Sequence, residues 1–264
     1  MQVQHALTVG FGLFVAGSAF GQVNFTGNYS QDFNGLAQSG STTIAGQGPH
    51  ALNGVLGSTG VDGWYGHNSF GSSSSTEFKA HNGSMGSSAG RGVIFFGTNG
   101  SSDRALGYLP TSNQSGGFGI VLTNASSDTY QSIDLSFFGE QWRAGEANIL
   151  NTLTFYYGVG TSLSNATTYH GALDFNTPFL GGGEIGVDGN NASFRTLING
   201  SITGLNWAPG QSIVLRWDNP DLSGQDNGLA IDDLVITGVV PTPGAIALLG
   251  LATVLGGRRR RIHA

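Results

Sequence analysis

Residues 130–142 read Tyr-Gln-Ser-Ile-Asp-Leu-Ser-Phe-Phe-Gly-Glu-Gln-Trp, and apolar side chains alternate with polar ones along most of this stretch. In an extended chain Ile133, Leu135 and Phe137 point to one face, and the polar residues between them point to the other. A period of two is typical of a β-strand with one buried face, whereas an amphipathic helix repeats about every 3.6 residues. These residues therefore predict a strand that packs one face against a hydrophobic core.

The same period of two recurs on both sides of this stretch. It is clearest in residues 150–159 and 212–217, where Ile213, Leu215 and Trp217 share one face. Shorter alternating stretches predict further strands at residues 28–33, 76–81, 92–97, 104–109, 117–123, 193–198 and 229–237. Ten or so short strands with turn signals between them predict an all-β fold, a jelly-roll β-sandwich.

The stretches between the predicted strands are rich in glycine, serine and asparagine, as in residues 71–75 and 181–191. These residues favour turns because they tolerate positive φ or bond their side chains to nearby backbone. We find no repeat of fixed period and no linker long enough to divide the chain. Residues 22–239 are therefore interpreted as one domain.

Composition excludes several classes of protein. The chain has 264 residues, 10% of them charged, and its 16 Phe, 7 Tyr and 4 Trp supply a core that disordered chains lack. Its net charge of −6 disfavours nucleic-acid binding. Since there is no cysteine, there is neither a disulfide framework nor a thiolate metal site.

The charge is divided between a domain and a tail. All 16 acidic residues and six of the ten basic residues lie before residue 240, which gives this part a net charge of −10. The other four basic residues, Arg258, Arg259, Arg260 and Arg261, give the tail +4. The two parts therefore belong to different physical environments.

The N-terminus has the pattern of a secretory signal peptide. Residues 6–20 form an apolar run too short to span a bilayer, and the small residues Ala19 and Gly21 flank Phe20 before Gln22. The segment preceding the run carries no Lys or Arg, which departs from the usual signal. We expect residues 1–21 to be a signal peptide; the alternative is a buried N-terminal strand.

The C-terminus combines a proline motif, an apolar run and an arginine cluster. Val240-Pro241-Thr242-Pro243 precedes residues 244–257, which contain no charge, and the four arginines follow directly. Fourteen residues rise about 21 Å as a helix, which is short of the roughly 30 Å hydrocarbon core. The arginines would remain cytoplasmic by the positive-inside rule. A plain C-terminal membrane anchor with a proline-rich hinge is one interpretation.

This three-part order resembles the PEP-CTERM sorting signal of exported bacterial proteins over residues 240–264. The resemblance implies that a membrane-embedded exosortase recognises Pro241 and Pro243, cuts nearby and delivers the protein to the cell envelope or extracellular matrix. Thr242 stands where the commonest form of the motif has Glu. A second resemblance, over about ten residues, is that of Gly228-Leu-Ala-Ile-Asp-Asp-Leu234 to the closing strand of lectin-like and adhesion-type jelly rolls.

One acidic segment is a candidate calcium site. Asp218, Asp221 and Asp226 lie within nine residues in a turn-rich stretch, and Asp232 follows on the next predicted strand. Carboxylate oxygens are the ligands that calcium prefers, although the spacing is not that of an EF-hand. The alternative is an acidic surface hairpin whose Asp and Asn side chains close turns.

Two further groups of residues suggest carbohydrate chemistry. Trp64 and Tyr65 are expected either to stack on a sugar ring or to plug the edge of the sandwich. Glu140 and Glu146 have the residue type of a glycosidase pair, but six extended residues separate them by about 20 Å. We expect Glu140 to form an ion pair with Arg143 or Arg216 instead.

These observations predict an exported, tail-sorted, non-catalytic protein with a structural or adhesive role at a cell surface or in its matrix. The alternatives are a calcium-assisted carbohydrate-binding module and, less favoured, a secreted polysaccharide hydrolase. An exosortase, a membrane and an extracellular polysaccharide are the expected partners.

Overall fold

The computed structural model describes residues 21–68, 75–84, 90–110 and 114–241. The predicted signal peptide, apart from Gly21, and the predicted sorting signal, apart from Val240 and Pro241, lie outside these residues. No helix in the described part of the chain is long and apolar enough to cross a membrane. The regular structure consists of strands and three short 3-10 turns, η1 (Val55–Gly57), η2 (Leu163–Asn165) and η3 (Gly171–Leu173).

Two sheets contain all the strands of the described residues. Sheet A runs in the order β12 (Thr168–Tyr169), β11 (Thr152–Val159), β16 (Ser212–Asn219), β9 (Gly116–Asn124), β5 (Trp64–Asn68) and β4 (His50–Ala51), with β1 (Val23–Phe25) beside β9 and β13 (Phe175–Asn176) beside β11. Sheet B runs in the order β14 (Ile185–Gly186), β10 (Tyr130–Ala144), β17 (Gly228–Val239), β8 (Ala105–Leu109), β7 (Gly92–Phe96), β6 (Ser75–His81) and β3 (Ser41–Ala45), with β15 (Arg195–Trp207) beside β10 and β2 (Asn28–Gln31) beside β17.

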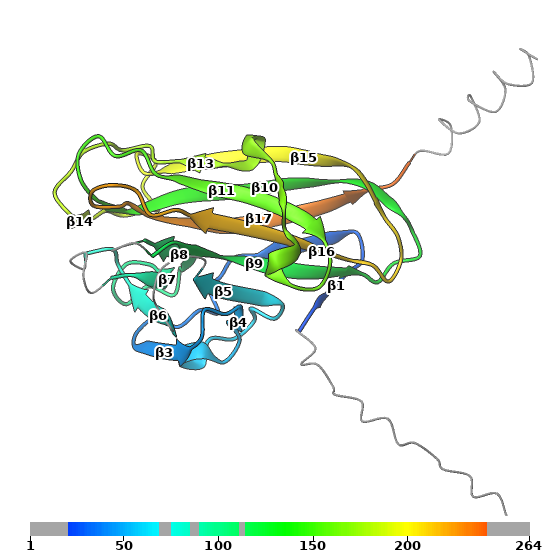
Figure 1. Cartoon of the computed structure of the whole chain (residues 1–264), viewed down its shortest axis with the longest axis horizontal. Helices are drawn as coiled ribbons and strands as arrows, with labels where there is room; N and C mark the ends of the chain where they lie inside the picture. The colour runs from blue at the N-terminus through cyan, green and yellow to red at the C-terminus, as the bar shows by residue number, and fades with distance from the viewer. Residues whose placement is uncertain (1–20, 69–74, 85–89, 111–113, 242–264) are drawn as a thin grey trace, which may run out of the picture.

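The chain passes repeatedly from one sheet to the other. From β8 onward the longer strands β8, β9, β10, β11, β15, β16 and β17 belong to sheets B, A, B, A, B, A and B in turn. Neighbouring strands are antiparallel except for the pairs β1–β9 and β6–β7. This alternation is the winding of a jelly roll, and the predicted all-β sandwich is confirmed (Figure 1).

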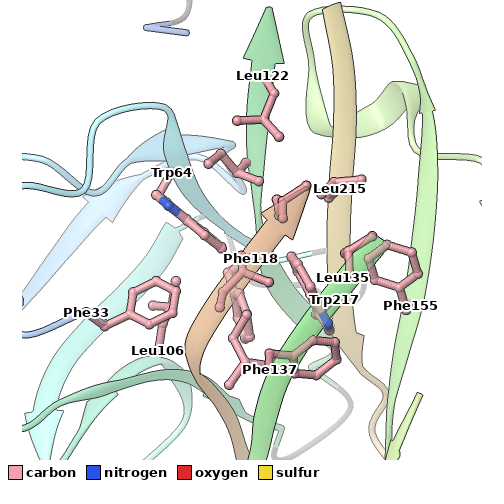
Figure 2. Close-up of a cluster of buried hydrophobic side chains, with 14 of the residues drawn as sticks. Phe33, Trp64, Leu106, Phe118, Leu122, Leu135, Phe137, Phe155, Leu215 and Trp217 are labelled. Carbon is pink, nitrogen blue, oxygen red and sulfur yellow. The ribbon is translucent and has the colours of Figure 1, made fainter. Parts of the chain in front are cut away.

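Aromatic side chains join the two sheets in the core. Trp217 of β16 lies 6.0 Å from Trp64, 6.0 Å from Phe118 and 5.0 Å from Phe155 between ring centroids, all within sheet A. Phe137 of β10 reaches Trp217 from sheet B with an edge-to-face contact at 5.6 Å. Figure 2 shows these rings in one cluster, which excludes water from the space between the sheets. The period-two residues of the sequence therefore form the core that they predicted.

The predicted strands match the observed ones to within a few residues, with one exception. The strand predicted at residues 193–198 runs as β15 from Arg195 to Trp207. Gly200, Gly204 and the polar residues between them obscure its period, yet β15 pairs with β10 from Arg195 to Trp207. Its packing against a long neighbour overrides its low β-propensity.

Candidate functional site

A groove of about 440 Å³ lies on the outer face of sheet A. Its walls come from the Gly48–Pro49 turn on one side and the η2 turn on the other. The polar side chains His67 and Asp218 lie between these walls, beside Arg216. The groove is thus a surface feature of the sheet and lies outside the aromatic core.

Strand register places these side chains in two rows across sheet A. His67 of β5 is paired with Gly117 of β9, which is paired with Asp218 of β16. Because side chains alternate along a strand, these residues point outward while their neighbours Phe118 and Trp217 point into the core. Gly117 carries no side chain, so the side chains of the two flanking strands can meet above it.

The second row contains the cation and an aromatic ring. Arg216 of β16 is paired with Gly119 of β9 on one side and Tyr156 of β11 on the other. Tyr156 is in turn paired with Tyr169 of the edge strand β12. The row ends at this edge in Tyr169, which is 57% exposed.

A polar network fixes the side chains in the groove. Asp218 accepts contacts from both sides, with Oδ1 3.1 Å from His67 Nε2 and Oδ2 3.0 Å from Arg216 Nε. Arg216 Nη1 also donates to the carbonyl of Leu163 at 2.9 Å, which ties the η2 turn to the sheet. The carboxylate is therefore paired on both sides, and the guanidinium is oriented by contacts with Asp218 and the Leu163 carbonyl.

Two tyrosines extend the network toward the edge of the sheet. The Arg216 guanidinium lies 5.1 Å from the centre of the Tyr156 ring, within the range of a cation–π contact. Tyr156 and Tyr169 lie 5.6 Å apart at an interplanar angle of 52°. Tyr169 Oη donates to Asp174 Oδ2 at 2.6 Å, which holds the exposed ring in place. Flat apolar surfaces thus adjoin groups that donate and accept hydrogen bonds.

No family model matches the chain, and neither does any curated protein sequence. Solved structures of similar fold include a xylan-binding domain of Paenibacillus barcinonensis (10% identity, TM-score 0.35, covering 77% of this chain and 97% of that domain). Another is the K1 cleaved adhesin domain of Lys-gingipain from Porphyromonas gingivalis, at 15% identity and a TM-score of 0.30, covering 80% of this chain and 98% of that domain. A third is a mannan-recognising carbohydrate-binding module, TmCBM27, at 10% identity and a TM-score of 0.33, covering 76% of this chain and 99% of that module. Similarities this distant say nothing about the ligand of this chain.

The predicted sugar-stacking residues do not reach the surface. Trp64 is fully buried, and its Nε1 donates to Tyr29 Oη at 2.8 Å. Tyr65 is 2% exposed, and its hydroxyl donates to the carbonyl of Gly21. The prediction that these rings stack on a sugar is wrong, because no ligand face is accessible on either. Trp64 packs inside the sandwich, whereas Tyr65 packs with Val121 and Leu163 in a small cluster on the outer face of sheet A.

The four aspartates predicted as calcium ligands are not gathered at one point. Asp218 lies in the groove, Asp221 and Asp226 interact with each other near the β16–β17 connection, and Asp232 lies on β17 in sheet B. Within the described residues no group of three or more His, Asp or Glu is placed to hold a metal ion. The shared site is therefore not observed, since strand and loop geometry separates residues that are close in sequence.

Asp226 instead stabilises loops by burial and hydrogen bonding. Its Oδ1 accepts bonds from Asn151 Nδ2 at 2.8 Å and from the amide of Leu222 at 3.1 Å. Burial, with a smaller contribution from the neighbouring Asp221, raises the pKa of Asp226 to about 7. This carboxyl group thus connects the β16–β17 loop to the segment before β11.

Glu140 pairs with a different arginine from either expected one. It is buried, with Oε2 2.9 Å from Trp142 Nε1 and Oε1 3.4 Å from Arg195 Nη2. Arg195 is its register partner on β15, whereas Arg143 pairs with Glu184. Desolvation raises the pKa of Glu140 to about 7 and that of its neighbour Asp232 to about 9.

Tyr156, which lines the groove, and Tyr169, which lies beside Tyr156, are absent from the residues chosen from sequence. The signal was present for Tyr156, because the period of residues 150–159 places it on the polar face, opposite Leu153 and Phe155. Tyr169 lies in a two-residue strand that has no period to read. Their approach to Arg216 depends on the order of the strands in sheet A, which a sequence alone does not fix.

Proposed function

We propose that this chain is an exported, non-catalytic β-sandwich that binds a polysaccharide of the cell surface or matrix in the groove of sheet A. The observation that carries the proposal is the row formed by Arg216, Tyr156 and Tyr169 beside the Asp218–His67 pair. Specific pockets combine apolar rings with a few fixed polar groups, and this groove has both.

The chemistry of the groove suits sugar hydroxyls and sugar ring faces. A carboxylate accepts hydrogen bonds from hydroxyl groups, and a guanidinium donates to their oxygens. The negative face of a tyrosine ring attracts the C–H groups of a sugar, which carry partial positive charge. Four strand spacings separate β12 from β5, which is about 19 Å. That length suits several linked sugar units better than a single one.

The same groove lacks the pair of carboxylates that glycoside hydrolysis requires. Asp218 is the only carboxylate among the described residues that line it, and Arg216 and His67 already pair with it. Glycosidases place two carboxyl groups about 5–10 Å apart around the scissile bond. This supports binding without catalysis at this position.

Export is the second part of the proposal and rests on the sequence of the two ends. The apolar N-terminal run and the Pro241–Pro243 motif with its arginine cluster support passage across a membrane and processing by an exosortase. A domain with a net charge of −10 and polar loops is compatible with an extracellular matrix of hydrated polysaccharide. Polysaccharide binding then supplies the adhesive role.

Affinity electrophoresis of the full chain against a panel of neutral and acidic polysaccharides tests the groove. We expect Tyr156→Ala to weaken binding about tenfold or more, because it removes the stacking surface and the cation–π partner of Arg216. Tyr156→Phe keeps the ring and is expected to bind nearly as well. Val235→Ala, which changes an exposed side chain of β17 in the other sheet, is the matched control.

Two results would contradict the proposal. One is equal retardation of the wild type and Tyr156→Ala by the polysaccharide that binds best. The other is the absence of retardation by every polysaccharide in the panel, with circular dichroism showing that the wild type is folded.

A further inference from the structure

β15 is the longest strand with only one neighbour in the described structure. It spans 13 residues and pairs with β10 alone, whereas the other one-partner strands have two to five residues. Figure 1 shows β15 running along the margin of the sandwich. A long open edge presents backbone groups that can form hydrogen bonds with another strand.

The register identifies which backbone groups face the open side. The amide of Gln141 donates to the carbonyl of Phe194, so this pair is hydrogen-bonded. Hydrogen-bonded pairs recur every second residue in an antiparallel ladder. The even-numbered residues of β15 therefore bond to β10, and the N–H and C=O groups of the odd-numbered ones point away. Within residues 196–203 the outward-facing residues are Leu197, Asn199, Ser201 and Thr203, whose backbone groups make no hydrogen bond elsewhere in the described residues.

Residues 196–203 of this edge lack two of the devices that usually prevent pairing, charge and proline. Residues 196–203, Thr-Leu-Ile-Asn-Gly-Ser-Ile-Thr, contain no charged residue and no proline. The left-handed φ values of Gly204 (72°) and Asn206 (47°) lie beyond this segment, so it remains extended throughout. Leu197 is 50% exposed. Natural edge strands are commonly protected by Lys, Pro or a bulge, and this segment contains neither Lys nor Pro.

We propose that residues 196–203 pair with the same residues of a second copy of this chain, antiparallel about a two-fold axis near Gly200. Antiparallel pairing of one strand with itself is self-complementary, because each copy offers the same donors and acceptors in reverse order. Four outward residues per copy form about eight backbone hydrogen bonds. The two copies then share one continuous sheet B.

The distribution of charge favours a second copy over other occupants. The domain carries −10, and like charges placed directly opposite each other destabilise paired strands. Residues 196–203 are uncharged, so two copies meet here without facing charges. Charges elsewhere on the two domains are screened over about 8 Å at physiological salt. In this pairing Leu197 of one copy lies beside Thr203 of the other, which covers its exposed side chain.

The mass of the full chain in solution tests this pairing, measured by sedimentation in mild detergent because residues 244–257 are apolar. We expect the wild type to sediment as a dimer and Asn199→Lys to sediment as a monomer, because the two lysines, each opposite Ser201 of the other copy, would be diagonal neighbours of like charge across the axis. Thr43→Lys makes the same kind of change on β3, at the opposite edge of sheet B, and is expected to remain a dimer.

A charge-swapped pair separates loss of the interface from loss of the fold. Asn199→Glu alone is expected to be monomeric, and an equimolar mixture of Asn199→Lys and Asn199→Glu is expected to restore the dimer. A wild type that is monomeric at all concentrations would overturn the proposal. So would an Asn199→Lys dimer as stable as the wild-type dimer, or a mixture of the two variants that does not associate.

Discussion

Trp64 and Trp217 offer a matched test of how the core is stabilised. Both side chains are fully buried, and their rings stack 6.0 Å apart in the same cluster (Figure 2). Trp64 Nε1 donates to Tyr29 Oη at 2.8 Å. Trp217 Nε1 is buried and has no hydrogen-bond partner among the described residues. The same substitution, Trp→Phe, should therefore have unequal effects at the two positions.

The difference follows from the hydrogen bonding, because the loss of ring size is common to both variants. Trp64→Phe removes a hydrogen bond that contributes about 1 kcal/mol. Trp217→Phe removes an unpartnered donor whose burial costs about 1–3 kcal/mol. We expect Trp64→Phe to lower the free energy of unfolding by about 2–4 kcal/mol more than Trp217→Phe. For a domain of this size that corresponds to a Tm lower by roughly 4–16 °C.

Urea denaturation followed by far-UV circular dichroism measures this difference, with equal m-values as the condition for comparison. The substitution Phe118→Leu, which leaves both indoles in place, reports the cost of an ordinary change in the same cluster. Equal losses for the two tryptophan variants, or a larger loss for Trp217→Phe, would refute the argument from the unpartnered N–H.

The remaining predictions concern pH and export. Burial raises the pKa of Asp232 to about 9 and that of Glu140 to about 7. The folded chain therefore retains protons on these two groups that the unfolded chain releases near pH 4. As a result the two groups make the free energy of unfolding fall as pH rises from about 4 to about 9. Asp232→Asn is expected to make this fall with pH smaller and to raise the free energy of unfolding at pH 8 by about 2 kcal/mol or more. Denaturation at pH 5 and pH 8 measures both effects, and an unchanged dependence of stability on pH would contradict the prediction. Fractionation of producing cells is expected to place the protein in the envelope or the medium, and full-length protein in the cytoplasm would contradict export.

The fold was predictable because its signal is local. Alternation in residues 130–142 records which side of β10 faces the core, and burial of Ile133, Leu135 and Phe137 follows it directly. Strand pairing is not local, since β10 lies between β15 and β17, which come much later in the chain. The order of strands in each sheet therefore required the structure.

The candidate site was less predictable for the same reason. Asp218 was identified from its acidic neighbours, but its contact with His67 is set by the β5–β9–β16 register, whereas Arg216 lies two residues earlier on the same strand. Trp64 was expected either to stack on a sugar ring or to plug the sandwich, and its burial on β5 excludes the first role. Residue type indicates what chemistry is available, whereas register decides which side chains meet.

The two proposed surfaces are compatible because they belong to different sheets. The groove lies on the outer face of sheet A, whereas pairing through β15 extends sheet B at its margin. A dimer would therefore keep both grooves open. Two sites on one particle bind a repeating polymer more tightly than either does alone, because the second contact becomes intramolecular. Weak recognition in a shallow groove can then suffice for retention in a matrix, and a small domain without disulfides can serve as a cross-link between polysaccharide chains.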